Sequence, residues 1–372
     1  MNKYLRSFRN LFSKTPTYII LYVTAGCNAR CKMCFYWKNI DKVDRANELS
    51  LGEIERISKS FGFLEYATLT GGEPSIRNDL PAIARIFDKN NQVQFLSIPT
   101  NSLMTEKIKE TVEEILKTTR NPYLKLCLSL DGVGKDHDEI RGVPGAFEKV
   151  RANYKNLAKL KKQVKDFEIM INMTVSAFNY KKVKQVMDFV RSEMPEAVFD
   201  FCWARGDTRE KESKNIRASD YREVRELVDK EERNFSSGFT FSGIIAGNKL
   251  AARDIIYQVL RGRKRFYPCS AGRKMIIISE TGLVKPCEML NFEFGSLRDF
   301  DYDIKKILSQ DKTKEIFKFI KDKNCVCTFE NAIQNSIVNN FSMWPLLAKK
   351  IISRSKPQRF FKPANESDGG GD

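Results

Sequence analysis

Strand-like and helix-like segments alternate along the first half of the chain, and this rhythm limits the fold more than any other feature. Apolar runs rich in β-branched and aromatic residues are each followed by a stretch with apolar residues at helical spacing. The predicted strands are Ile19–Val23, Tyr66–Thr70, Val93–Pro99, Leu124–Leu130, Phe167–Val175 and Ala197–Cys202. The predicted helices are Leu51–Ser60, Leu80–Asn90, Glu106–Thr119, Ala146–Lys162 and Tyr180–Glu193. Repeated βα units of this kind predict an α/β fold, an open, partial (β/α)6 barrel of the TIM type, with reactive residues on the loops after the strands.

Composition sets wider bounds. The 372 residues, 42% of them hydrophobic, are enough for one barrel and a smaller module. No apolar run approaches the roughly 20 residues that a membrane-spanning helix needs, and the basic N-terminus lacks the apolar core and cleavage site of a secretory signal. The nine cysteines are therefore expected to be metal ligands rather than disulfides, in a reducing cytoplasm.

Three cysteines, Cys27, Cys31 and Cys34, follow the first predicted strand on a short polar loop with C-x3-C-x2-C spacing. Three soft thiolates from one loop suit an iron–sulfur cluster. A structural zinc ion would want a fourth Cys or His nearby, and the chain's single histidine, His137, is far away in sequence. Three ligands for a four-iron cube leave one iron open to a small molecule.

A glycine-rich turn, Gly71-Gly72-Glu73-Pro74, follows the second predicted strand. Its glycines would let the backbone approach a ligand, and Glu73 could accept a hydrogen bond from an ammonium group. Together with the cysteine triplet, this turn resembles the motifs of the radical S-adenosylmethionine (radical SAM) superfamily. The resemblance implies a [4Fe–4S] cluster whose open iron chelates the amino and carboxylate groups of S-adenosylmethionine. One electron then splits the sulfonium to a 5′-deoxyadenosyl radical.

Further loops at the predicted barrel mouth resemble the same family. Thr100 and Asn101 end the third strand, where the family places polar groups near the ribose of S-adenosylmethionine. Ser129 and Asp131 belong to a Ser-Leu-Asp-Gly sequence after the fourth strand, and Arg141 ends a His-Asp-x-x-Arg-Gly loop. By the resemblance, Ser129 and Arg141 hold the carboxylate of S-adenosylmethionine, a bidentate role that suits a guanidinium. For His137 we favour a loop-ordering role over acid–base chemistry.

Four more cysteines lie in the C-terminal third. Cys269 and Cys287 enclose a predicted β-hairpin, and Cys325 and Cys327 follow a helix-like stretch, Tyr302–Ile320. The spacing resembles the SPASM and twitch auxiliary-cluster modules of radical SAM enzymes, and the short twitch version fits better. The resemblance implies a second, auxiliary [4Fe–4S] cluster. Related sequences often carry another cysteine where Asn331 stands, so the fourth ligand is left open. A zinc site on the same thiolates is the competing interpretation.

The formal net charge of +17 is unevenly placed. Residues 1–14 and 341–362 carry ten basic side chains and no acidic one. Apolar residues recur at helical spacing in both segments, as with Phe8 and Phe12 in the first and Trp344, Leu347 and Ile351 in the second. Basic amphipathic ends suggest docking on an anionic membrane surface. Helices that merely cap the barrel are an equal alternative, and nucleic-acid binding is weaker because no such motif accompanies the charge.

These patterns divide the chain into five parts: a basic amphipathic helix (1–16), the radical SAM barrel (17–235), the auxiliary-cluster module (236–335), a second basic amphipathic helix (336–363) and a disordered tail (364–372). Cys127 and Cys202 lie within predicted strands and are expected in the core. Arg205, just after the sixth strand, is a candidate contact for an anionic group of a substrate or cofactor.

The sequence thus predicts an enzyme that cleaves S-adenosylmethionine reductively and abstracts hydrogen from an unidentified substrate, a peptide, a lipid or another small molecule. The partners expected are an electron donor such as ferredoxin or flavodoxin and, since few residues precede the first strand, a separate carrier for any peptide substrate. The enzyme would be cytoplasmic, and it would be peripheral on the inner face of the membrane if the basic ends dock there rather than cap the barrel. The alternative from another class is a non-catalytic, zinc-bound scaffold that docks on membrane or nucleic acid.

Overall fold

A computed structural model describes residues 13–231 and 242–354 of the chain. The six predicted strands are confirmed, and each begins and ends within two residues of the prediction. They are β1 (Tyr18–Thr24), β2 (Tyr66–Gly71), β3 (Phe95–Thr100), β4 (Tyr123–Ser129), β5 (Phe167–Val175) and β6 (Val198–Trp203). All of them pair in parallel with their neighbours in chain order, from β1 through β6. This is the partial barrel that the sequence predicts.

The sheet continues beyond β1 with strands from the C-terminal third. β7 (Met275–Ile278) pairs in parallel with β1, and β8 (Leu283–Lys285) and β9 (Gly295–Ser296) follow in antiparallel order. The predicted hairpin between Cys269 and Cys287 is therefore confirmed as β7 and β8. Its place was not predicted, because the hairpin extends the barrel sheet and the two parts share one nine-stranded sheet.

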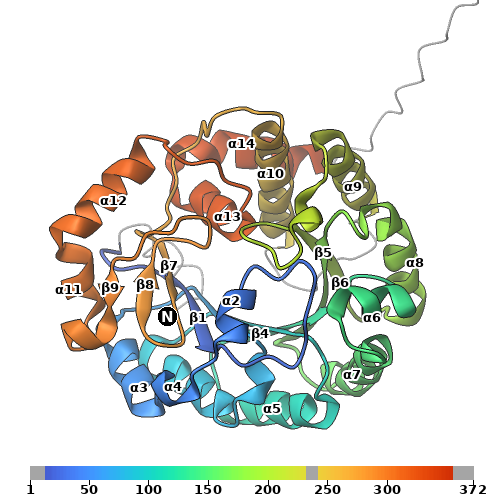
Figure 1. Ribbon diagram of the computed structural model, residues 1–372, viewed down its shortest axis with the longest axis horizontal. Helices are drawn as coiled ribbons and strands as arrows, with labels where there is room; N and C mark the ends of the chain where they lie inside the picture. Colours follow the sequence, from blue (N-terminus) through green and yellow to red (C-terminus); the bar gives the residue numbers. More distant parts are fainter. Residues whose placement is uncertain (1–12, 232–241, 355–372) are drawn as a thin grey trace, which may run out of the picture.

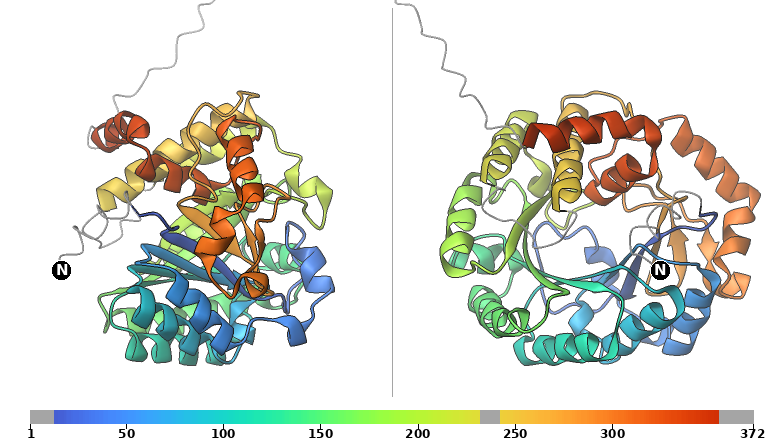
Figure 2. Two further views of the ribbon diagram at one scale, coloured as in Figure 1. Left: turned by 90° about the vertical axis from the view of Figure 1, so that its left-hand side faces the viewer. Right: turned by 180° about the vertical axis from the view of Figure 1, so that it is seen from behind.

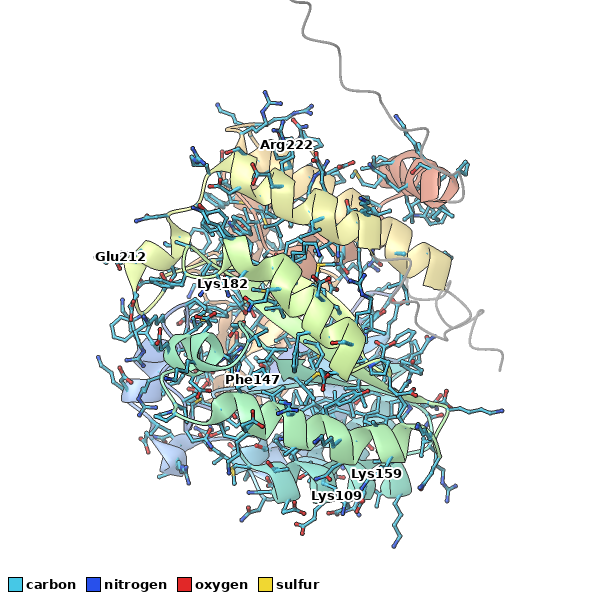
Figure 3. The ribbon with its side chains drawn as sticks, turned by 90° about the vertical axis from the view of Figure 1, so that its right-hand side faces the viewer. Lys109, Phe147, Lys159, Lys182, Glu212 and Arg222 are labelled. Carbon is cyan, nitrogen blue, oxygen red and sulfur yellow. The ribbon has the colours of Figure 1, made fainter. Side chains whose placement is uncertain are left out.

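Helices follow the parallel strands, and the longer of these helices cover the outside of the sheet (Figure 1). They are α2 (Trp37–Asp41), α3 (Leu51–Ser60), α4 (Leu80–Asn91), α5 (Thr105–Thr118), α6 (Lys135–Arg141), α7 (Ala146–Lys161), α8 (Val183–Glu193) and α9 (Ala218–Glu231). Short 3-10 turns, η1 (Arg45–Asn47), η2 (Pro74–Ile76), η3 (Tyr180–Lys182) and η4 (Lys211–Lys214), lie in the connections. In the side view of Figure 3, α7, which carries Phe147 and Lys159, and α9, which carries Arg222, lie on the outside of the molecule.

Helices from the C-terminal third close the ring where the barrel is open (Figures 1 and 2). They are α10 (Ser242–Leu260), α11 (Ile304–Ser309), α12 (Asp311–Lys321), α13 (Glu330–Asn339) and α14 (Trp344–Arg354), with 3-10 turns η6 (Leu297–Phe300) and η7 (Phe341–Met343). Figure 1 shows α10, α13 and α14 between α9 and α12. The single helical stretch predicted over Tyr302–Ile320 is two helices, because Gln310 is extended, with a ψ of 151°.

One continuous apolar core lies between the sheet and its outer helices. Ile19, Leu21 and Leu69 are almost fully buried, as the alternation of the strands requires. Ser50 and Glu53 form a capping box that fixes the start of α3. Glu53 also accepts a hydrogen bond from Arg298, 2.7 Å away, which ties α3 to η6 and lowers the pKa of Glu53 to about 2. The barrel and the C-terminal third are thus packed into one body.

The predicted basic ends fall partly outside the described residues. The N-terminal helix (1–16) and the tail (364–372) lie outside them, apart from residues 13–16. The described part of 336–363 is not one helix, because α13 ends at Asn339 and α14 begins at Trp344. On α14, Leu347 packs against the core and Ile351 lies against Gly247 of α10, whereas Trp344 is 38% exposed. None of the helices in 13–231 and 242–354 has the length and hydropathy to span a bilayer.

Candidate active site

The cysteine loop lies at the carboxyl end of β1, over the inside of the barrel. The thiols of Cys27, Cys31 and Cys34 line one cavity of about 790 Å³. The loop is fixed to α6 by two backbone hydrogen bonds of 3.0 Å, from Arg30 N–H to the carbonyl of Arg141 and from Lys32 N–H to that of Ile140. The sequence-predicted ligand triplet is therefore gathered at one wall of the cavity.

Burial and mutual repulsion disfavour bare thiolates in this loop. Burial raises the pKa of the Cys27 thiol to about 11 and that of Cys34 to about 12, and each also feels the negative charge of Cys31. The guanidinium of Arg141 lies 3.6 Å from the sulfur of Cys31, and the amide of Asn101 lies 3.8 Å from that of Cys27. Three partly buried thiols, two of them with a donor aimed at the sulfur, suit a bound iron–sulfur cluster, since a coordinating metal deprotonates a thiol outright.

The two glycines of the Gly-Gly-Glu-Pro turn allow a close approach to the cysteine loop. A side-chain Cβ at Gly71 would lie 2.2 Å from the carbonyl oxygen of Thr24, and one at Gly72 would lie 2.2 Å from that of Gly26. Gly71 also has a φ of +142°, which favours glycine. Hydrogen bonds from Gly72 N–H to Thr24 and from Glu73 N–H to Gly26 hold the loops together. Glycine is thus required at both positions because the turn packs directly against the cysteine loop. The sequence predicted a close approach to a ligand and did not reveal this contact with another loop of the chain.

Glu73 joins three loops at the mouth of the barrel. Its buried carboxylate accepts hydrogen bonds from Ser75 Oγ and Thr100 Oγ1, both at 2.7 Å, and from the backbone N–H of Asn101 at 2.7 Å. The side-chain amide of Asn101 donates to Asn28 beside Cys27, at 2.8 Å. Glu73 therefore orders the loops after β2 and β3 against the cysteine loop. Its oxygens already have internal donors, so the predicted contact with an ammonium group would be an additional one.

A buried ion pair connects the loop after β4 to the cysteine loop. Nε of Arg141 lies 2.5 Å from Oδ2 of Asp131, and the same guanidinium reaches Cys31. Asp131 also accepts a hydrogen bond from Thr174 N–H at 2.8 Å. His137 is completely buried, its Nδ1 accepts the N–H of Asp131 at 3.0 Å, and burial lowers its pKa to about 3. These contacts agree with a neutral, loop-ordering histidine.

The other predicted cofactor-binding residues lie in the same region. Pro74 is buried at the start of η2, and Ser129 lines the cavity at the end of β4. One supporting residue, Glu48, was missed. Its carboxylate accepts hydrogen bonds from Thr24 Oγ1 at 2.6 Å and Ala25 N–H at 2.9 Å, so it fixes the entry to the cysteine loop. Nothing in the local sequence around Glu48 indicates this role, because its partners are twenty-three and twenty-four residues away in the chain.

The four C-terminal cysteines lie near one another and are not among the residues that line the cavity. Burial raises the pKa of Cys287 to about 12 and that of Cys327 to about 11, and each is raised further by the charge of Cys269. Cys325 also feels the charge of Cys269. In the part of the chain that is described, no three His, Cys, Asp or Glu side chains are grouped to hold a single metal ion.

A buried cation accompanies these thiols. Arg265 is 2% exposed, and its guanidinium donates to the sulfur of Cys325 at 3.2 Å and to the carbonyl of Ile320. A buried charge needs a compensating partner, and thiolates would supply negative charge beside this guanidinium. Tyr267, also fully buried, lies beside Cys327. The donor set therefore fits an anionic thiolate-bound group, although the described side chains do not form the grouping that a single zinc ion needs.

Arg205 lies between the two cysteine sites. Its guanidinium pairs with Glu288 at 2.7 Å and with Glu330 at 3.3 Å, and Glu288 also accepts the hydroxyl of Tyr22 at 2.9 Å. Arg205 is thus held by internal carboxylates, and its expected contact with an anionic ligand would compete with them. Both glutamates were missed, although Glu288 directly follows Cys287. The network joins β1 and β6 to the C-terminal module.

The core position expected for the two remaining cysteines is confirmed for Cys127, which is buried, but not for Cys202, which is only partly buried. Cys127 and Cys202 were expected in the core, and both lie on strands, but both also line the cavity. The sulfur of Cys127 lies 3.6 Å from Ser97 Oγ and 3.8 Å from the sulfur of Met170. The barrel interior is therefore open at these positions.

Comparison with known proteins agrees with this geometry. The family model of the Radical SAM superfamily matches residues 21–190, a range that contains the cysteine triplet, the glycine-rich turn and the Asp131–Arg141 pair. Residues 21–190 therefore form a domain of the radical SAM superfamily. Membership implies a [4Fe–4S] cluster and S-adenosylmethionine as cofactors.

The curated relatives of this radical SAM protein are named after different reactions. An AdoMet-dependent heme synthase of Methanosarcina barkeri is 27% identical over 215 residues, which is 57% of this chain and 57% of that protein. A GTP 3′,8-cyclase of Mannheimia succiniciproducens is 30% identical over 144 residues, or 37% of this chain and 43% of the cyclase. The chain therefore spans less than two thirds of the length of these relatives, and the similarity does not identify its substrate.

Solved structures share the fold. Streptococcus suis SuiB bound to S-adenosylmethionine is 18% identical, with a TM-score of 0.60 over 82% of this chain and 68% of SuiB. The protein anSMEcpe with bound AdoMet and a Kp18Cys peptide is 16% identical, with a TM-score of 0.58 over 91% of this chain and 99% of anSMEcpe. At this identity the likeness shows the fold, which here includes much of the C-terminal third.

Proposed function

We propose that this radical SAM protein cleaves S-adenosylmethionine reductively and abstracts a hydrogen atom from a substrate held in the barrel. The observation that carries the proposal is the meeting of the three thiols, the Glu73 network and Arg141 at one end of a single cavity. When bound, a reduced cluster supplies the electron that splits the sulfonium into methionine and a 5′-deoxyadenosyl radical. The substrate and net reaction are not given by the site, and oxidation, cross-linking, epimerisation and methylene insertion are all compatible with it.

The chain's own residues would bind and orient the cofactors. Cys27, Cys31 and Cys34 would hold the cluster. The guanidinium of Arg141 would remain charged at any working pH, because Asp131 and Cys31 raise its pKa despite burial, and it would attract the carboxylate of S-adenosylmethionine together with Ser129. Backbone carbonyls of the Gly71–Pro74 turn would accept from the amino group.

Glu73 would keep Thr100 and Asn101 in place near the ribose. Burial raises the pKa of Glu73, and its hydrogen-bond donors act in the opposite sense. The charged form of Glu73, and with it the network, therefore depends on those hydrogen bonds.

We propose a second [4Fe–4S] cluster at Cys269, Cys287, Cys325 and Cys327. The four thiols influence one another electrostatically, and the buried Arg265 beside Cys325 would compensate part of the cluster's negative charge. Glu288 and Glu330 line the cavity and are close in sequence to Cys287 and Cys327. The distance from this cluster to the cavity would therefore be short, so that electrons could be transferred between them or a substrate group could reach the cluster. This interpretation corresponds to the twitch module of the family, with residues 236–335 as its domain.

The partners follow from charge and surface. The net charge of +17 would attract an acidic electron carrier of the ferredoxin or flavodoxin kind by long-range Coulomb steering.

We further propose peripheral, reversible docking on the cytoplasmic face of a membrane. Phe341 and Ile352 are 58% and 59% exposed, and they flank the basic positions Lys349 and Lys350. Part of the apolar face of α14 is used for packing, so docking would rest on these exposed residues rather than on the whole helix.

Product analysis tests the proposed chemistry. Anaerobically reconstituted protein with a strong reductant should convert S-adenosylmethionine to 5′-deoxyadenosine and methionine, and Cys34→Ala should abolish this because two thiolates do not hold the cube. Cys202→Ala is a matched control for cluster content, since the sulfur of Cys202 lies against Asn172 and Thr174 of β5 and does not belong to the proposed ligand loop. Undiminished cleavage in Cys34→Ala, or colourless wild-type protein that contains zinc and no iron, would refute the proposal and favour the scaffold alternative.

A further inference from the structure

The cavity runs the length of the barrel, from the cysteine loop to the opposite end of the strands. Its first layer is aromatic. Tyr18, Tyr66, Phe95 and Tyr123 are the first residues of β1 to β4 and lie in register with one another. Their ring centroids follow at 5.4, 4.6 and 6.2 Å, and the first three of them line the cavity. An aromatic surface of this extent favours an apolar ligand.

The next layer is polar but carries little net charge. Lys125 pairs with Glu168 at 3.2 Å, and Asp200 pairs with Lys249 at 2.7 Å and Arg253 at 2.9 Å. Asp229 also pairs with Arg253, at 2.5 Å, so the three cations are compensated by three carboxylates. The layer therefore offers hydrogen bonds to a polar group, while a charged group would have to displace an existing ion pair.

Side-chain amides cover the facing wall. Along α13, the cavity is lined at helical spacing by Asn331, Gln334, Asn335 and Asn339, and Asn248 of α10 adds another amide. The buried Oδ1 of Asn248 has no hydrogen-bond partner within the described chain. Amides both donate and accept, so this wall suits an uncharged group that carries hydroxyls or amides.

The cavity reaches the surface at the aromatic end. Ile244 at the start of α10 and Trp344 at the start of α14 both line it, yet they are 42% and 38% exposed. The side views place α14 and the start of α10 at the end of the molecule away from α2, which follows the cysteine loop (Figures 2 and 3). Outside the opening, Phe341 packs edge-on against Trp344 at 4.7 Å and is 58% exposed. We call the opening between Ile244 and Trp344 the apolar mouth.

We propose that the barrel binds an amphipathic substrate, with an uncharged, hydrogen-bonding head group and an apolar chain. The head group lies between the α13 amides and the polar layer, below the cysteine loop. The chain lies along the aromatic layer and leaves through the apolar mouth, beside Phe341 of η7. This inference rests on the proposed function, because it assigns a substrate class to the same cavity. A peptide substrate would use the amide wall but would not need the aromatic layer and the mouth.

Binding of 1-monoacylglycerols to the anaerobic, two-cluster protein tests the proposal. These probes combine a neutral hydroxylated head with a chain of adjustable length, and titration calorimetry below their aggregation concentration gives the affinity. Each added methylene should tighten binding about fourfold, equivalent to about 0.8 kcal/mol, until the chain fills the path to the mouth. A probe brominated near the end of its chain should quench the fluorescence of Trp344, and Trp344→Phe should remove the quenched component.

Two matched substitutions at exposed isoleucines provide the control. Ile244→Lys places a charge in the mouth and should weaken binding at least tenfold, with a loss of the dependence on chain length. Ile352→Lys places the same charge on the neighbouring helix, at a residue outside the cavity, and should leave binding and S-adenosylmethionine cleavage unchanged. Affinity that is independent of chain length, or equal in the two variants, would overturn the proposal and favour a peptide or another wholly polar substrate.

The same preparation separates this inference from the proposed function. If the unaltered protein forms 5′-deoxyadenosine but binds no monoacylglycerol in a chain-dependent way, only the substrate class is wrong. If it forms no 5′-deoxyadenosine, the proposed function is wrong whatever the probes show.

Discussion

Arg205 is predicted to be the main electrostatic link between the barrel and the C-terminal third. The side chain is 12% exposed, and it pairs with Glu288 and Glu330, whose side chains are 8% and 15% exposed. Replacing it with the uncharged Met would leave two nearly buried carboxylates facing each other. Removal of one partner from a buried ion pair costs roughly 3–5 kcal/mol, and the second carboxylate places Arg205→Met at the upper end of that range.

The direction of the pH dependence can be derived from Glu330. Burial raises the pKa of this carboxyl, and Arg205 acts in the opposite sense, so Arg205→Met should raise the pKa further. A carboxyl whose folded pKa is raised destabilises the fold once the pH rises through that pKa, because the folded state holds the proton more tightly than the unfolded state. The loss in Arg205→Met should therefore be largest at neutral pH and shrink as the pH falls toward the ordinary carboxyl range.

Urea unfolding followed by tryptophan fluorescence measures this effect. Trp203 is a local reporter, because its backbone N–H donates to Glu330 at 2.9 Å. Arg205→Met with Glu288→Gln and Glu330→Gln should recover most of the stability, since the uncompensated charges are gone. A loss below about 1 kcal/mol in the single variant, the size of an exposed pair, would refute the reasoning. So would an equal loss in the triple variant.

Two further predictions concern the second cluster and location. Cys269→Ala with Cys287→Ala should lower the iron content from about eight to about four per chain on the two-cluster assignment, with partial retention of S-adenosylmethionine cleavage; unchanged iron would show that these cysteines are not ligands. Phe341→Ser with Ile352→Ser should reduce sedimentation with anionic vesicles, because less apolar area enters the interface, and salt should weaken sedimentation in both proteins, because it screens the basic residues. Equal recovery in the supernatant with and without anionic lipid would exclude docking.

The barrel was predictable because its signals are local. Each strand alternates or is uniformly apolar, and each outer helix has one apolar face, so a short window of sequence identifies it. The cysteine triplet and the glycine-rich turn were equally visible, since their spacing is within one loop. Their joint position followed from topology, because parallel strands bring their carboxyl ends to one edge.

Other parts depended on contacts that a local window does not contain. Helix α10, Ser242–Leu260, was not predicted, because Ile244 and Ile245 at its start face the cavity while Ala251 and Ile255 are buried, which leaves a weak amphipathic pattern. The pairing of β7 with β1 joins segments more than two hundred residues apart. Glu48, Glu288 and Glu330 were missed for the same reason, since an isolated glutamate reads as a surface residue until its partners are known.

The central claim is that the Cys27, Cys31 and Cys34 cluster has an open iron that binds S-adenosylmethionine. Electron paramagnetic resonance of the reduced Cys269→Ala, Cys287→Ala protein observes that cluster alone. Adding S-adenosylmethionine should change the g values of its signal, because the amino and carboxylate groups become ligands of the open iron. A spectrum that is the same with and without S-adenosylmethionine, in protein shown to contain a reduced [4Fe–4S] cluster, would contradict the claim.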